Sequence, residues 1–115
     1  MSMRVEMADL PGEITSRGST GFLLSSVMDS RPHAAHLPFQ VAAADGQVQL
    51  RAAAGRTARG NCGMRPAVTV LFPATEPGGH SLIIDGEARV DSEEHVIVTA
   101  VNAVLHRPAA VPGEG

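Results

Sequence analysis

Apolar and polar residues alternate along much of the chain after Phe22, and turn-forming residues interrupt the alternation at several points. In the stretch HAAHLPFQVAA, which begins at His33, the apolar residues at every second position share one face: Ala35, Leu37, Phe39 and Val41. A period of two is typical of a β-strand with one buried face. Pro38 cannot donate a hydrogen bond to a neighbouring strand, so it predicts a sheet edge or a bulge at this point.

The next apolar stretch, GQVQLRAAA, repeats the alternation with polar residues on the opposite face. Asp45 and Gly46 lie between the two stretches and are typical of a tight turn, so we expect a β-hairpin. Residues 67–72 and 81–90 alternate in the same way and predict two more strands. The β-branched residues of positions 95–99 favour a strand, although VTAVNAVLH alone can be read as a strand or a helix.

A short helix is predicted ahead of the strands, in the stretch MADLPGEITSRGSTG. Asp9 can cap its start, Pro11 suits its first turn, and Gly18 can end it. An arginine-rich crossover, irregular or helical, is expected near residues 55–65. About six strands after one short helix predict a mainly β fold, a closed or nearly closed antiparallel barrel.

The length and composition bound the number of domains and the oligomeric state. A chain of 115 residues is typical of one domain, which we expect over residues 1–107. Residues 108–115 carry Pro and Gly without periodicity and predict a flexible tail. Apolar residues make up 43% of the chain but aromatic residues only 3%, so the core is thin. Because such a core gains from burial against a second subunit, we expect a homodimer.

The charge and the cysteine content narrow the range of partners. All nine basic residues are arginine and the formal net charge is −3, which argues against nucleic acid as a partner. Cys62 is the only cysteine, so it cannot form an intrachain disulfide. No stretch resembles a signal peptide or approaches the roughly 18 consecutive apolar residues of a membrane-spanning helix. We therefore expect a cytoplasmic protein without a membrane partner.

The residue types that usually carry catalysis form no constellation in the sequence. His33 and His36 are three positions apart, which on a strand places them on opposite faces, so they cannot share a metal ion. Ser25 and Ser26 lie in an apolar strand without a GxSxG motif, and Cys62 has no evident histidine partner. The sequence therefore predicts no catalytic residue and no metal site.

The stretch GRTARGNCGMRPAVTV, residues 55–70, carries the clearest binding chemistry. Arg56 and Arg59 have planar guanidinium groups that can grip phosphate oxygens in pairs, and Thr57 adds a hydroxyl group. Glycines let backbone N–H groups approach an anion closely. GNCG also matches the GXXG loop of RNA-binding KH domains, but the lysines that accompany that loop are lacking. The residues by themselves leave two interpretations open, a phosphate site and a solvated basic loop.

The order of these features resembles one known family. The helix, the stretch GFLLSSVMDSRPHAAHLPFQV, the hairpin with its arginine-rich loop, and LIIDGEARV are similar to the pyridoxamine 5'-phosphate oxidase-like family of FMN-binding split β-barrels. Asn61 five residues ahead of Pro66, and the Pro-x-Val-Thr start of the next strand, also match. The resemblance covers about residues 10–92. It implies a six-stranded antiparallel split β-barrel and a homodimer with the flavin between the subunits.

The resemblance also implies a cofactor, FMN or a deazaflavin coenzyme, and the residues that bind it. Those near the ring and the ribityl chain would be His36, Leu37, Pro38, Arg51 and Ala53. Those that hold the phosphate would be Arg56, Thr57, Arg59 and Asn61. Because a flavin itself performs hydride transfer, the implied function is an oxidoreductase acting on a small-molecule substrate. The alternatives are a non-catalytic barrel that binds a flavin or another small molecule, and a cofactor-free split-barrel dimer.

Overall fold

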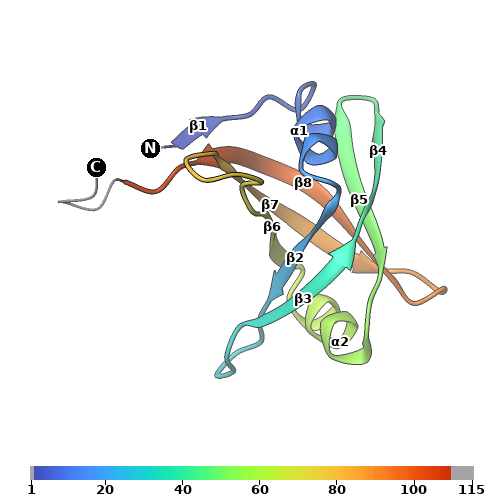
Figure 1. Ribbon diagram of the computed structural model, residues 1–115. Coiled ribbons are helices and arrows are strands. Elements are labelled where there is room, and N and C mark those ends of the chain that lie inside the picture. Colours follow the sequence, from blue (N-terminus) through green and yellow to red (C-terminus); the bar gives the residue numbers. More distant parts are fainter. Residues whose placement is uncertain (1, 110–115) are drawn as a thin grey trace.

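The computed structural model describes residues 2–109, which form strands and two short helices (Figure 1). The elements in chain order are β1 (Ser2–Arg4), α1 (Leu10–Ser16), β2 (Thr20–Ser25), β3 (His33–Pro38), β4 (Gln40–Ala44), β5 (Gln47–Ala53), α2 (Arg56–Met64), β6 (Ala67–Phe72), β7 (Ser81–Val90) and β8 (His95–His106). Within the described residues, no helix is long and apolar enough to cross a membrane. Residues 110–115 of the predicted tail lie outside the described residues.

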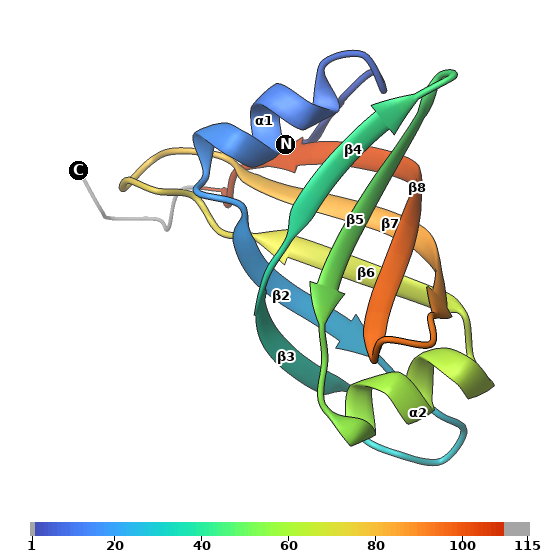
Figure 2. The same cartoon turned by 90° about the vertical axis from the view of Figure 1, so that its right-hand side faces the viewer.

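The strands form one antiparallel sheet that curls into a half-barrel (Figure 2). Their order is β3-β2-β6-β7-β8-β5-β4, and β1 pairs with β8 beside this path. The predicted mainly β split barrel is confirmed, and the crossover near residues 55–65 is the helix α2. The described residues form eight strands where six were predicted. The difference arises because Phe39 divides one predicted strand into β3 and β4, and because Ser2–Arg4 adds a short strand.

The chain passes from one edge of the sheet to the other at Phe39. β3 and β4 stand at the two ends of the strand order, yet only Phe39 separates them in sequence. Its N–H donates to the carbonyl of Ser19 at 2.9 Å, and its buried ring packs edge-on against Phe72. Pro38, which precedes it, has no N–H to continue the ladder. The interruption therefore falls beside the proline from which it was predicted.

Alternate residues of the strands point into the half-barrel and form one apolar core. The central strands each contribute fully buried side chains, among them Leu23, Leu50, Val70, Ile84 and Val98. Burial of one such side chain contributes about 1.5–3 kcal/mol. Residues at the positions between them face outward, as the period of two predicted. The same alternation therefore defines both the core and an outer face on which polar side chains collect.

The pairing of β7 with β8 shifts by one residue at Gly86. Asp85 pairs with Asn102 and Gly86 with Ala100, so Val101 is an extra residue in β8. A Cβ atom at Gly86 would come within 2.6 Å of a backbone carbonyl oxygen of β8, an approach that only glycine permits. Val101 is left 63% exposed. The bulge therefore places an apolar side chain on the surface of the sheet.

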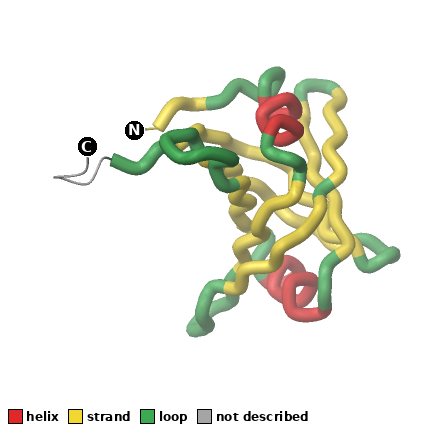
Figure 3. Tube along the Cα trace, viewed as in Figure 1, coloured by secondary structure: helices red, strands yellow, loops and turns green. Residues whose placement is uncertain are grey.

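The two helices lie at opposite ends of the half-barrel (Figure 3). Helix α1 buries Leu10 and Ile14, and helix α2 buries Ala58 and Cys62. Burial raises the pKa of the Cys62 thiol, which favours its protonated form and a role in packing. Helix α2 packs against β7, β2 and β8. Its exposed side therefore carries the arginines at one end of the barrel.

Candidate functional site

Helix α2 follows closely on the end of β5, so its N-terminus lies where the predicted phosphate-binding stretch begins. Gly55 occupies the N-cap position and offers no side chain to the N–H groups of the first turn. These N–H groups have no partner within a helix, and the helix dipole gives this end a partial positive charge. The first turn carries no acidic residue. This end of α2 can therefore receive an anion.

Arg56, Thr57 and Arg59 follow in the first turns of α2. Arg56 and Thr57 are exposed, and the side chain of Arg56 makes no hydrogen bond or ion pair with another described residue. Arg59 is partly buried, and its Nη1 lies 3.6 Å from Oε1 of Glu94. The Nε of Arg59 is buried and has no hydrogen-bond partner among residues 2–109. The guanidinium of Arg56 and the Nη groups of Arg59 therefore keep donors for an anionic ligand, whereas the buried Nε of Arg59 does not face solvent.

Asn61 lies further along α2 and turns toward the core. Its Nδ2 donates to the Oγ of Ser25 at 3.3 Å, and Ser25 is buried. Ser25 pairs in register with His33 of β3, whose Nδ1 is buried without a partner in the described part of the chain. Asn61 thus ties α2 to β2. This polar cluster was missed in the sequence, although Ser25 is a polar residue at an inward position of an apolar strand.

Arg51 lies on the outer face of β5, where acidic groups surround its guanidinium. Its Nη2 lies 3.0 Å from Oδ2 of Asp91, 3.2 Å from Oε2 of Glu93 and 3.4 Å from Nδ1 of His95. The pKa of Asp91 is lowered, chiefly by the backbone N–H of His95 and further by that of Glu93 and by the charge of Arg51. Arg51 is therefore paired within the protein through its Nη2, while its buried Nε has no hydrogen-bond partner among residues 2–109. Its acidic partners follow it by 40 residues or more, a contact that no local pattern indicates.

The remaining predicted residues lie on β3 and at the end of β5. His36 is exposed and stacks on Phe22 of β2, with the ring centroids 4.4 Å apart. Leu37 packs against the core, whereas Pro38 and Ala53 are exposed. β3 contacts β5, and Figure 2 shows β3, the last residues of β5 and α2 at the same end of the half-barrel. The predicted residues thus lie on three separate elements, β3, β5 and α2.

A shallow hollow of about 380 Å³ marks the outer face of the sheet over β2, β6 and β7. Its lining is mixed, with apolar side chains beside carboxylates: Leu24, Thr69, Asp85, Glu87 and Val101 are among the residues around it. Asp85 accepts a hydrogen bond from the hydroxyl group of Thr69 at 2.9 Å. The outer face is therefore neither uniformly polar nor covered by another element of the described chain.

The antiparallel half-barrel with one short helix at each end is a split-barrel fold, and solved structures share this fold. A putative pyridoxamine 5'-phosphate oxidase from Listeria innocua superimposes with a TM-score of 0.62 and 22% identity, over 87% of this chain and 98% of that one. The FAD-binding protein of Mycobacterium smegmatis gives 0.64 and 17%, over 93% and 100%. An FAD-binding protein of Mesorhizobium loti gives 0.57 and 13%, over 91% and 96%. The resemblance inferred from the sequence is confirmed at the level of the fold.

Matches found by sequence cover less of the chain than the matches to solved structures. No family model matches the chain. An uncharacterized protein of Mycobacterium tuberculosis and one of Mycobacterium bovis are each 42% identical to it over 62 residues. The match covers 49% of this chain and 43% of each relative, so the chain spans less than half the length of these proteins.

Proposed function

We propose that this protein binds a flavin that carries a phosphate group, FMN or a deazaflavin coenzyme, with the phosphate at the N-terminal end of α2. The observation that carries the proposal is that Arg56 and Arg59 keep donors beside a helix end that no side chain caps. A phosphate group would accept bonds from both guanidinium groups and from the first-turn N–H groups. The hydroxyl group of Thr57 would add one more donor. The FAD-binding proteins that share the fold support a flavin as the ligand class.

We propose that the ring and the ribityl chain lie along His36, Leu37, Pro38 and Ala53. These residues support the proposal because β3 contacts β5 at the end of the barrel that α2 occupies. The bound flavin would supply hydride transfer, and the chain would bind and orient it. Asn61 would hold α2 against β2, and Arg51 would contribute indirectly, through its acidic partners. A small-molecule substrate would approach the open face of the ring.

We further propose that residues 1–107 form one domain and that two copies associate with the flavin between them. Two features support a homodimer. The aromatic content of 3% makes the core of a single copy thin, and Val101 exposes an apolar side chain beside the hollow on the outer face. Burial of that face against a second copy would remove apolar surface from water.

Titration of the purified protein with FMN and with riboflavin, followed by flavin fluorescence, tests the phosphate site. FMN should bind more tightly than riboflavin, which lacks the phosphate. Arg56→Ala should weaken FMN binding about tenfold or more, because a charge-assisted hydrogen bond contributes about 1.5–3 kcal/mol. Arg65→Ala is the matched control, since it removes one charge from the residue that follows α2 at its other end. A native mass from the same preparation reports the dimer.

Two results would contradict the proposal: no binding of FMN or of a deazaflavin, or equal affinity for FMN and riboflavin. The oxidoreductase function needs a further observation, reduction of the bound flavin by an electron donor with turnover. A flavin that binds at the phosphate site and is never turned over would favour the non-catalytic alternative.

A further inference from the structure

Residues 91–94, the acidic turn, connect β7 to β8, and hydrogen bonds within the turn hold its backbone in place. Oδ1 of Asp91 accepts the backbone N–H groups of Glu93 and His95, both at 2.9 Å. The N–H of Asp91 donates to the carbonyl of His95 at 3.0 Å. These three bonds close the turn on itself, so its side chains project from a fixed backbone.

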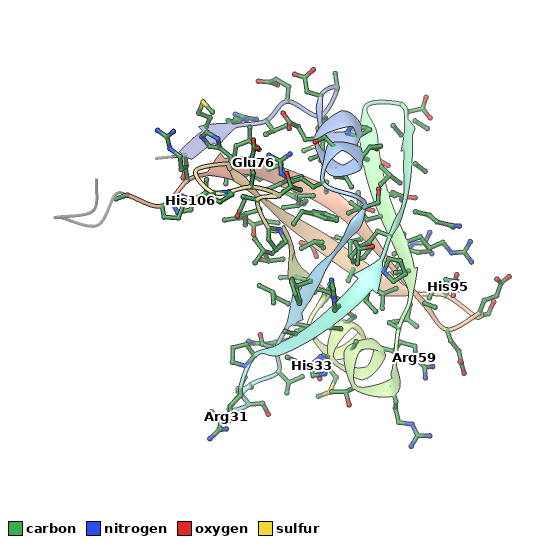
Figure 4. All side chains as sticks on the ribbon, viewed as in Figure 1. Arg31, His33, Arg59, Glu76, His95 and His106 are labelled. Carbon is green, nitrogen blue, oxygen red and sulfur yellow. The ribbon has the colours of Figure 1, made fainter. Side chains whose placement is uncertain are left out.

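A further bond fixes the acidic turn against the segment that leads into α2. The N–H of Ala54 donates to the carbonyl of Glu94 at 3.3 Å. Glu94 adopts a φ of +66°, in the left-handed region that few residues other than glycine occupy. Its backbone is therefore held in a specific conformation, with its carboxylate toward Arg59. Figure 4 shows His95, the residue after Glu94, on the same side of the molecule as Arg59.

The acidic turn contacts two arginines, Arg51 and Arg59, and the contact with Arg59 is longer. Arg51 is hydrogen-bonded to Asp91 and Glu93 at 3.0 and 3.2 Å. Arg59 lies 3.6 Å from Glu94, which is an electrostatic contact too long for a hydrogen bond. The Glu94 side chain is 74% exposed and that of Arg59 is 26% exposed. Glu94 thus attracts Arg59 without accepting a hydrogen bond from it, whereas the Nη2 of Arg51 is hydrogen-bonded. The buried Nε atoms of both arginines lack a partner in residues 2–109, so the contrast lies in their Nη groups.

We propose that Glu94 is an intramolecular competitor for the phosphate-binding arginine, so that it limits how tightly the phosphate of the flavin is held. The inference rests on the proposed function. A carboxylate fixed beside Arg59 and the phosphate of a ligand seek the same guanidinium, and the two anions repel each other. The carboxylate is exposed and its contact is long, so the phosphate displaces it at a modest cost in affinity. Glu94 therefore lowers the preference of the protein for a phosphorylated over an unphosphorylated flavin.

The test is a titration of wild-type protein and Glu94→Gln with FMN and with riboflavin at low salt. Glutamine keeps the length of the side chain and removes the charge. FMN should bind about two- to fivefold more tightly to the variant, the range expected for an exposed ion pair, and riboflavin should bind equally to both. Glu76→Gln is the matched control, because it also removes one surface charge, and Figure 4 shows Glu76 far from Arg59. It should leave both affinities unchanged.

A second comparison uses Arg59→Gln with and without Glu94→Gln. If Glu94 competes for Arg59, its replacement should improve FMN binding less once Arg59 is gone, because only the direct repulsion between the two anions is then relieved. Unchanged or weaker FMN binding by Glu94→Gln, in a protein that prefers FMN to riboflavin, would overturn the competitor role and leave the phosphate site standing. Equal binding of FMN and riboflavin by the wild-type protein would overturn both, so the two failures are distinguishable.

Discussion

Helices α1 and α2 lie at opposite ends of the half-barrel and each buries two side chains, yet their arginines are bonded in different ways. Arg17, at the end of α1, donates twice to the carbonyl of His80 and twice to Glu13, with all four distances between 2.9 and 3.2 Å. Arg56 has no partner among the described residues, and Arg59 has one ion pair at 3.6 Å. Arg17 therefore joins elements of the fold, whereas the guanidinium groups of Arg56 and Arg59 keep donors that the proposed ligand would use.

The same comparison holds for the buried sides of the helices. Helix α1 buries Leu10 and Ile14, whereas α2 buries the smaller Ala58 and Cys62. Glycine and arginine make up much of the rest of α2, and glycine is a poor helix former. Helix α1 thus contributes mainly to the core. Helix α2 depends on its neighbours for its stability and presents its polar side to solvent.

Truncation of the α1 core residue should have the largest effect. Ile14→Ala is expected to lower the free energy of unfolding by about 2–5 kcal/mol, because Ile14 is fully buried and the vacated space cannot close completely. Cys62→Ala in α2 should lower the free energy of unfolding less, since the side chains of cysteine and alanine are similar in size. Urea-induced unfolding of the two variants measures both. A larger loss for Cys62→Ala would contradict the contrast between the helices.

Replacement of Arg17 or Arg59 by alanine should affect different properties, the first the stability of the protein and the second its binding of FMN. Arg17→Ala is expected to lower the free energy of unfolding by about 1–3 kcal/mol, because its side chain is 11% exposed and its removal leaves the carbonyl of His80 without its donors. Arg59→Ala should change stability by no more than about 0.5 kcal/mol and weaken FMN binding instead. Urea unfolding and FMN titration of both variants give the result. Loss of stability alone in Arg59→Ala would remove the distinction.

The smallest effect is expected at a glycine of α2. Nothing lies within 4 Å of a Cβ placed at Gly60, so Gly60→Ala should raise the free energy of unfolding by about 0.5–1 kcal/mol through the gain in helix propensity. Gly21→Ala is the opposed control, because its Cβ would come within 2.7 Å of Phe72 and of the carbonyl of Leu71. It should destabilise the protein. Thermal unfolding of both variants checks the signs, and destabilisation by Gly60→Ala would mean that α2 requires the glycine.

Most of the fold could be predicted because five of the eight strands have one buried face and β3 alternates between half-buried and exposed residues. The alternation in Ser81–Val90 reproduces the whole of β7, and the turn at Asp45 and Gly46 reproduces the hairpin of β4 and β5. Strand β1 could not be predicted, since its residues are exposed and its partners in β8 lie about a hundred positions away. A strand that buries no side chain leaves no periodic pattern in the sequence.

The candidate site could be predicted only in part, because the sequence shows the type of each residue but not which distant residues it contacts. Arg56 and Arg59 were identified from their chemistry and from the glycines beside them. Their sequence gives no indication that Arg51 is enclosed by carboxylates or that Arg59 faces Glu94. Those contacts depend on where the acidic turn lies after the sheet has curled. The order of elements in the sequence indicated the family resemblance, whereas the charges around each arginine depend on contacts that only the structure shows.

The two edge strands of the half-barrel, β3 and β4, are joined to each other by the main chain and not by hydrogen bonds. Hydrogen bonds join each strand to the next from β3 to β4, and the main chain at Phe39 then connects β4 back to β3. One residue spans at most about 3.3–3.6 Å, so the two edges next to Phe39 cannot move apart by more than a small distance. Neither β3 nor β4 can therefore separate from the other at this corner, which restricts pairing with a neighbouring molecule there. The tether at Phe39 therefore lowers the risk of strand exchange and aggregation at the open side of the barrel.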